Sequence, residues 1–160
     1  MRVADSLLTW SFTSEADENA KTAAELTRGR LVMSVAENVI WDFSWTWIEM
    51  LEWLSENWKV LTAEHEASAS DSEEDETSWN FLHEHSLGSA VQGAVTPLLI
   101  IWRDGDTGYI DAGPGYGRGP WQPIEDSLWT LGEHIASYLN EDDERGAITL
   151  RNWEAVAGRS

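Results

Sequence analysis

The chain contains no cysteine, and only two of its ten basic residues are lysine. The absence of cysteine excludes a disulfide framework and a zinc site built on thiolates. No run of 18 or more apolar residues is present, so the sequence predicts no membrane-spanning helix. The first residues turn polar and acidic too early for a signal peptide. Together these absences favour a cytoplasmic protein.

Signatures of catalysis are sparse as well. No serine lies in a G-x-S-x-G elbow, and the stretch GPGYGRGP lacks the lysine of a phosphate loop. Ligand chemistry is concentrated in LHEHS, where His83, Glu84 and His85 could serve a metal-dependent hydrolase. The two imidazoles would share a side on a strand but not on a helix, and the H-E-x-x-H spacing is absent. We therefore expect no catalytic residue, no metal and no cofactor, and keep the hydrolase as an alternative.

Negative charge is what the sequence has in excess. Asp and Glu number 29 against 10 Lys and Arg, for a formal net charge of −19. The segment EHEASASDSEEDETS predicts a solvated acidic linker at about 64–77 within one acidic domain, 1–160. Such a field repels nucleic acid and anionic membranes and attracts basic proteins. We expect a basic protein partner, without direct nucleic-acid binding.

Hydrophobic periodicity predicts an α+β fold, with an antiparallel sheet, two main amphipathic helices and a looser third. Alternating apolar residues predict a strand at 6–14 and two strands at 29–43 that turn at Glu37-Asn38. A continuous apolar run, Leu98 to Trp102, followed by an Asp-Gly turn at Asp104-Gly105 predicts a hairpin at 96–113. A short helix or a loop is expected at 15–26, the looser helix at 78–94, a glycine- and proline-rich loop at 113–123, and a strand or short helix with Trp153 packed back in the tail.

The two main helices are predicted from apolar stripes. Thr46 is spaced from Glu49 as in a capping box and is the expected N-cap of the first. Its stripe comprises Trp47, Leu51, Leu54, Trp58 and Leu61. The second helix is expected at 123–143, with a stripe comprising Ile124, Leu128, Leu131, Ile135 and Leu139.

Tryptophan is concentrated in WDFSWTWIEMLEWLSENW, residues 41–58, which holds five of the eleven in the chain. The stripe indicates that most of these indoles are core. Trp53 lies on the flank of the stripe and is the candidate for a contact surface. We expect that surface to combine Trp53 with Tyr116, Arg118 and Trp121, because buried aromatic residues and arginine carry most interface energy.

Three motifs together suggest a family resemblance: the W-x-W…W-L…N-W helix, the H-S-L-x-x-A segment and the W-R-x-G-D turn. Over residues 29–140 the sequence resembles the domain preceding the peptidase in some bacterial ImmA/IrrE-type metallopeptidase proteins. The H-E-x-x-H of that peptidase does not occur here, so no catalytic residue is carried over.

The resemblance implies a recognition module of a bacterial defence, stress or mobile-element conflict system. We expect a non-catalytic, acidic protein-binding module. The alternative is an immunity or inhibitor protein that mimics nucleic acid and blocks a basic nuclease or nucleic-acid-binding protein.

Overall fold

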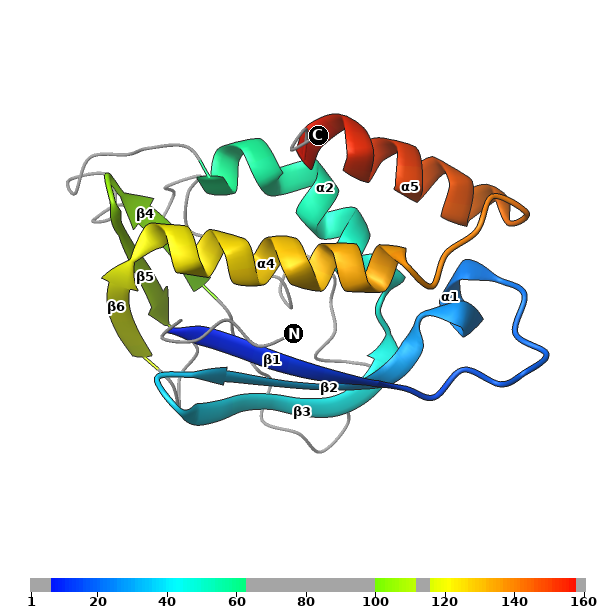
Figure 1. Cartoon of the computed structure of the whole chain (residues 1–160), viewed down its shortest axis with the longest axis horizontal. Helices are drawn as coiled ribbons and strands as arrows, with labels where there is room; N and C mark the ends of the chain where they lie inside the picture. The colour runs from blue at the N-terminus through cyan, green and yellow to red at the C-terminus, as the bar shows by residue number, and fades with distance from the viewer. Residues whose placement is uncertain (1–6, 63–99, 112–115, 158–160) are drawn as a thin grey trace.

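The computed structural model describes residues 7–62, 100–111 and 116–157 (Figure 1). These residues form two three-stranded antiparallel sheets together with helices. The α+β class is therefore confirmed, with two sheets where one was expected. The acidic linker at about 64–77, the looser helix at 78–94 and the cluster His83, Glu84 and His85 lie outside the described residues.

The first sheet has the strand order β1-β2-β3, with β1 at Leu8–Ser14, β2 at Arg28–Val35 and β3 at Asn38–Thr46. As the alternation predicts, Leu31, Met33 and Val35 are all buried. The turn between β2 and β3 is formed by Ala36 and Glu37, at φ 50° and 72°, one residue earlier than expected. Positive φ at both turn residues suits the right-handed twist of a hairpin.

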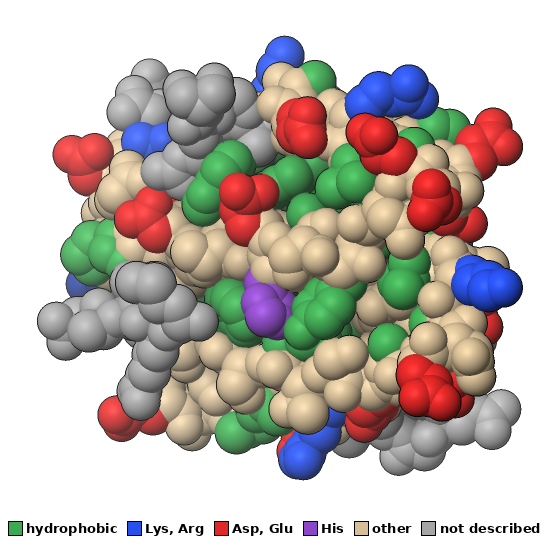
Figure 2. All heavy atoms as spheres, turned by 45° about the vertical axis from the view of Figure 1, so that its right-hand side comes forward, with side chains coloured by type: hydrophobic (Ala, Val, Ile, Leu, Met, Phe, Trp, Pro, Cys, Tyr) green, Lys and Arg blue, Asp and Glu red, His purple; other side chains and the backbone are tan. Residues whose placement is uncertain are grey.

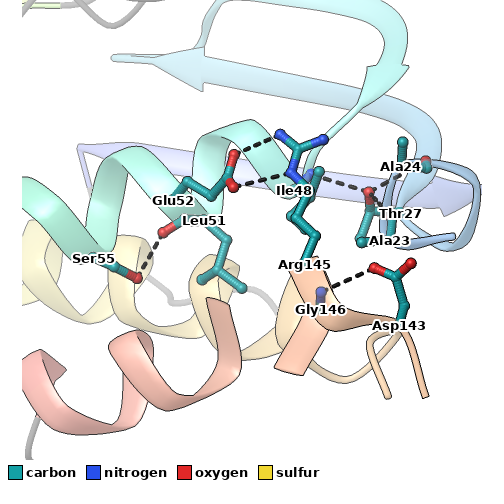
Figure 3. Close-up of polar contacts among 10 residues, drawn as sticks. All are labelled: Ala23, Ala24, Thr27, Ile48, Leu51, Glu52, Ser55, Asp143, Arg145 and Gly146. Carbon is teal, nitrogen blue, oxygen red and sulfur yellow. Dashed lines mark hydrogen bonds and ion pairs between the residues drawn. The ribbon is translucent and has the colours of Figure 1, made fainter. Parts of the chain in front are cut away.

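The start of helix α2 (Ile48–Thr62) differs from the prediction. Thr46 is not its N-cap but the last residue of β3. The cap comes instead from Thr27, 21 residues earlier, whose buried hydroxyl accepts a hydrogen bond from Ile48 N at 3.0 Å (Figure 3). The same hydroxyl donates to the Ala23 carbonyl of the short helix α1 (Ala23–Leu26) at 2.8 Å. One side chain therefore joins the end of α1 to the start of α2.

Both predicted stripes are confirmed. All five members of the α2 stripe are buried. Helix α4 (Trp121–Ala136) buries Ile124, Leu128, Leu131 and Ile135, while Leu139 is partly buried just beyond its end. Helix α4 thus begins two residues earlier and ends seven residues earlier than expected.

The tail forms a helix, α5 (Glu144–Ala157), which decides between the two possibilities that its sequence left open. Trp153 packs back as expected and is buried. Its ring stacks on that of Trp129 at a centroid distance of 5.1 Å and meets the ring of Trp58 edge-on at 5.5 Å. This cluster joins α5 to α2 and α4.

The second sheet has the order β4-β5-β6, with β4 at Ile100–Asp104, β5 at Thr107–Asp111 and β6 at Tyr116–Pro120. The predicted hairpin is present, but its turn residues are Gly105, at φ 60°, and Asp106. The loop expected at 113–123 is wrong for residues 116–123, which form β6 and the first turn of α4. Gly117 and Gly119 pair with Ile110 and Gly108. A Cβ atom on Gly117 would come within 2.8 Å of Leu7 Cδ1, so a glycine suits this position of the strand.

In Figure 1, α4 runs alongside β1, α2 lies next to α4, and α5 lies next to α2. The second sheet sits at one end of this stack and contacts α2 through β4 and α4 through β5. One hydrophobic core runs through both sheets and the three longer helices. The second sheet thus has one side on the core, where Ile101 and Ile110 are buried, while Tyr116 and Arg118 are exposed on β6.

Candidate functional site

The structure separates the four residues that were expected to form one contact surface. Trp53 and Trp121 are each only 1% exposed. Helix α2 contacts both α4 and α5, so more of its circumference is covered than the stripe predicts. The Trp121 indole lies beneath the Arg103 guanidinium, at 5.5 Å, and donates to Glu125 Oε1 at 3.0 Å. Both indoles are therefore part of the folded interior, and we remove them from the contact surface.

Tyr116 and Arg118 do lie together, on the outward side of β6. Tyr116 is 60% exposed, and Arg118 is exposed as well. The backbone register places Arg118 beside Tyr109 and Tyr116 beside Asp111. Within the part of the chain that the structure describes, no ion pair engages the Arg118 guanidinium. Its donors are free to meet another molecule.

Two further aromatic residues complete this surface, and the sequence-based prediction missed them. Trp102 pairs with Tyr109 in the sheet, and their rings stack at 5.1 Å with an interplanar angle of 6°. Each alternates with a buried isoleucine, Ile101 or Ile110. That period-two alternation was the signal that could have found them.

We call this surface the outer face of the second sheet and define it by Trp102, Tyr109, Tyr116 and Arg118. A row of Trp102, Tyr109 and Arg118 crosses the three strands. Beside the row is an open depression lined by Asp106, Thr107, Tyr109, Arg118, Gly119 and Pro120.

Gly108 explains how close the second sheet lies to α4. A Cβ atom at this position would come within 2.5 Å of Ile124 Cδ1 and 2.9 Å of Trp121 Cε3. Only glycine therefore lets β5 rest directly on the start of α4. The inner side of the second sheet therefore packs on α4, and this contact positions the opposite side of the sheet.

Arg103 has a structural role, in contrast to Arg118. Its Nε donates to the Gly105 carbonyl at 2.6 Å, its Nη1 donates to the Thr62 carbonyl, and its guanidinium covers Trp121. It therefore joins the end of α2 to the turn of the β4–β5 hairpin. The sequence did not reveal this role of Arg103, because Thr62 and Trp121 lie far from it along the chain.

Histidine and carboxylate side chains within the described ranges do not form a metal-binding cluster. No group of three or more His, Asp or Glu side chains there is placed to hold a metal ion. His134 is instead surrounded by aromatic rings, with centroids at 5.3 Å from those of Trp10, Phe12 and Tyr138. Figure 2 shows the imidazole between hydrophobic side chains. Burial lowers the pKa of His134 below its ordinary value.

Acidification is expected to weaken the fold through His134. The unfolded chain takes up a proton at this residue near pH 6.5, whereas the folded protein does so only at lower pH. Between these values the unfolded state binds more protons, so the free energy of unfolding falls as the pH drops. In His134→Phe this contribution is absent. Urea unfolding of both proteins at pH 7.5 and 5.5 measures it, and an equal loss in the two proteins would contradict the expectation.

Comparisons with known proteins add no relative to this picture. No protein-family model, no curated protein and no solved structure matched the chain. The resemblance to the domain preceding an ImmA/IrrE-type peptidase therefore stays a prediction. In the described part of the chain, no helix is both long enough and apolar enough to cross a membrane.

Proposed function

We propose that this chain is a non-catalytic, acidic protein-binding module whose partner docks on the outer face of the second sheet. The row of Trp102, Tyr109 and Arg118, with the exposed Tyr116 beside it, is the observation that supports this most. Tryptophan, tyrosine and arginine are the residue types enriched at interface hot spots.

The rigidity of this face favours docking. The stacked pair of Trp102 and Tyr109 is already ordered, and the strands behind it rest on α4 through Gly108. A preorganised surface loses little side-chain entropy on binding, so more of the contact energy contributes to affinity. Arg118 supplies donors for a carbonyl or carboxylate group of the partner.

Net charge supports a basic partner. A protein of net charge −19 attracts positively charged proteins over long distances and raises their association rate. Figure 2 shows acidic side chains over the visible surface, with fewer basic ones. This acidity also favours the second candidate function, a nucleic-acid-mimicking inhibitor of a basic nuclease. Membership of a defence or conflict system rests on the resemblance alone.

Capture from a lysate of the source cells, treated with nuclease and eluted with a salt gradient, identifies the partner. Its affinity is then measured for Arg118→Ala and Tyr116→Ala, with Arg151→Ala and Val39→Ala as controls at other exposed positions. We expect each of the first two substitutions to weaken binding by roughly 5- to 30-fold, which corresponds to a loss of about 1–2 kcal/mol, and the controls to bind like wild type.

The result distinguishes the candidates. Equal affinity of all four variants, or no partner retained by the wild type, would contradict docking on the outer face of the second sheet. Release of a basic enzyme at moderate salt, unaffected by Arg118→Ala, would favour the inhibitor instead, because salt screens attraction between surfaces beyond about 10 Å.

A further inference from the structure

A second surface feature lies away from the outer face of the second sheet, between α2 and α5. We call it the α2–α5 groove, and it is lined by Glu52, Glu144, Arg145, Ile148 and Thr149. The lining combines charged side chains with the exposed apolar side chain of Ile148 and the hydroxyl of Thr149.

Carboxylates dominate the charge around the groove. Glu52 of α2 accepts two hydrogen bonds from Arg145 of α5, at 2.7 and 3.0 Å (Figure 3). The hydrogen bond to Glu52 is the main cause that raises the pKa of Arg145, and the charges of Glu49 and Asp143 add to it. Of the residues that line the groove, Glu52 and Glu144 are acidic and only Arg145 is basic, so the lining keeps a net negative charge.

Arg145 provides an example of a basic side chain bound by a carboxylate of the groove. Its guanidinium lies across from α5 to α2 and is held by both oxygens of Glu52 (Figure 3). Asp143 also caps the start of α5, because its Oδ2 accepts a hydrogen bond from Gly146 N at 3.0 Å. Glu144 is exposed and makes no ion pair with any other described residue.

Thr149 is the independent observation at this site. The residue is only 3% exposed and lines the groove, yet its hydroxyl makes no hydrogen bond with any residue that the structure describes. The hydroxyl itself is not fully enclosed by protein, so it reaches the solvent in the groove and can pair with a bound group. Ile148, next to it in the chain and 42% exposed, offers apolar surface at the same groove.

We propose that the α2–α5 groove binds the side chain of an arginine or lysine from a basic protein segment. The aliphatic stem packs on Ile148, and the charged end donates to Glu144 and to the Thr149 hydroxyl. Lysine and arginine commonly bury the stem against apolar surface while the head group stays at the polar edge. This site is separate from the outer face of the second sheet and does not depend on it.

The test uses a minimal probe, the tripeptide acetyl-Gly-Arg-Gly-amide, titrated into the whole protein with methyl-labelled isoleucine and threonine. The Ile148 and Thr149 methyl resonances are expected to shift and to saturate. The same peptide with citrulline in place of arginine has nearly the same shape without the charge and should bind more weakly. A lysine tripeptide is expected to shift the same two methyl groups.

Two variants separate the groove from general attraction to an acidic surface. Thr149→Val keeps the side-chain shape and removes the hydroxyl, and is expected to weaken the arginine peptide by roughly 2- to 10-fold, the usual worth of one hydrogen bond. Glu56→Gln is the control, because Glu56 is exposed on α2 but does not line the groove. It removes one negative charge and should leave the affinity unchanged within the error of the titration.

Each remaining outcome overturns the proposal. Shifts that do not saturate, or that occur equally with citrulline, would show that the groove does not recognise a basic side chain. Thr149→Val leaves the net charge unchanged, so wild-type affinity in Thr149→Val together with weaker binding in Glu56→Gln would assign the binding to the net charge of the protein.

Discussion

Trp153→Ala is expected to lower the free energy of unfolding by about 3–5 kcal/mol, the range for removing a large buried aromatic side chain. The Trp153 ring contacts those of Trp58 and Trp129, and its Nε1 donates to Glu133 Oε2 at 2.9 Å. A Cβ atom on Gly132 would come within 2.5 Å of the indole, so the ring lies directly on the backbone of α4. Alanine would leave a cavity at the junction of three helices.

Urea unfolding followed by circular dichroism measures this loss as a lower midpoint. Trp102→Ala is the matched control, because it removes the same side chain from a half-buried position on the outer face of the second sheet. We expect a clearly smaller loss for Trp102→Ala. If both variants were destabilised by less than about 1 kcal/mol, the packing of α5 on α2 and α4 would be wrong.

Thr27→Val is expected to cost about 1–3 kcal/mol, the usual penalty for leaving a buried polar group without its partner. Valine has nearly the same shape, so the change removes the hydroxyl that Ile48 N and the Ala23 carbonyl share and little else. The Ile48 N–H lies at the first turn of α2, where no carbonyl of the helix itself can accept it. The loss should therefore be concentrated at the start of that helix.

Hydrogen exchange of the Ile48 amide, together with urea unfolding, tests this cap. Exchange should be faster in Thr27→Val than in wild type, whereas Thr27→Ser, which keeps the hydroxyl, should stay close to wild type. Unchanged protection in Thr27→Val would mean that another group caps α2.

Periodic patterns were the part of the structure that the sequence predicted well. The stripes of α2 and α4 were found because a residue on a helix returns to the same side every 3.6 positions, and burial follows that side. The strands of the first sheet were found in the same way from alternation, and the β4–β5 hairpin from a continuous apolar run followed by an Asp-Gly turn. These patterns are local, so they can be recognised in the sequence without knowing which segments pack against them.

Residues on the flank of a pattern were less predictable. Trp53 looked like a contact residue because it lies beside the stripe, but it is buried, on a helix that both α4 and α5 contact. Tyr116 and Arg118 were predicted to share a surface with Trp53 and Trp121, yet in the structure their neighbours on the sheet are Trp102 and Tyr109, and Trp121 is buried. Which side of a short strand meets the core is decided by its neighbours.

The sequence by itself determined the acidity of the protein, its class of fold and the apolar stripes of its two main helices. These properties follow from composition and from backbone periodicity, which need no information about distant segments. Only the tertiary structure decided that Thr27 caps α2, that β6 joins β5, and that the groove between α2 and α5 holds the Thr149 hydroxyl. Each of these depends on residues far apart in sequence, whose contacts are set by how the helices and sheets pack together.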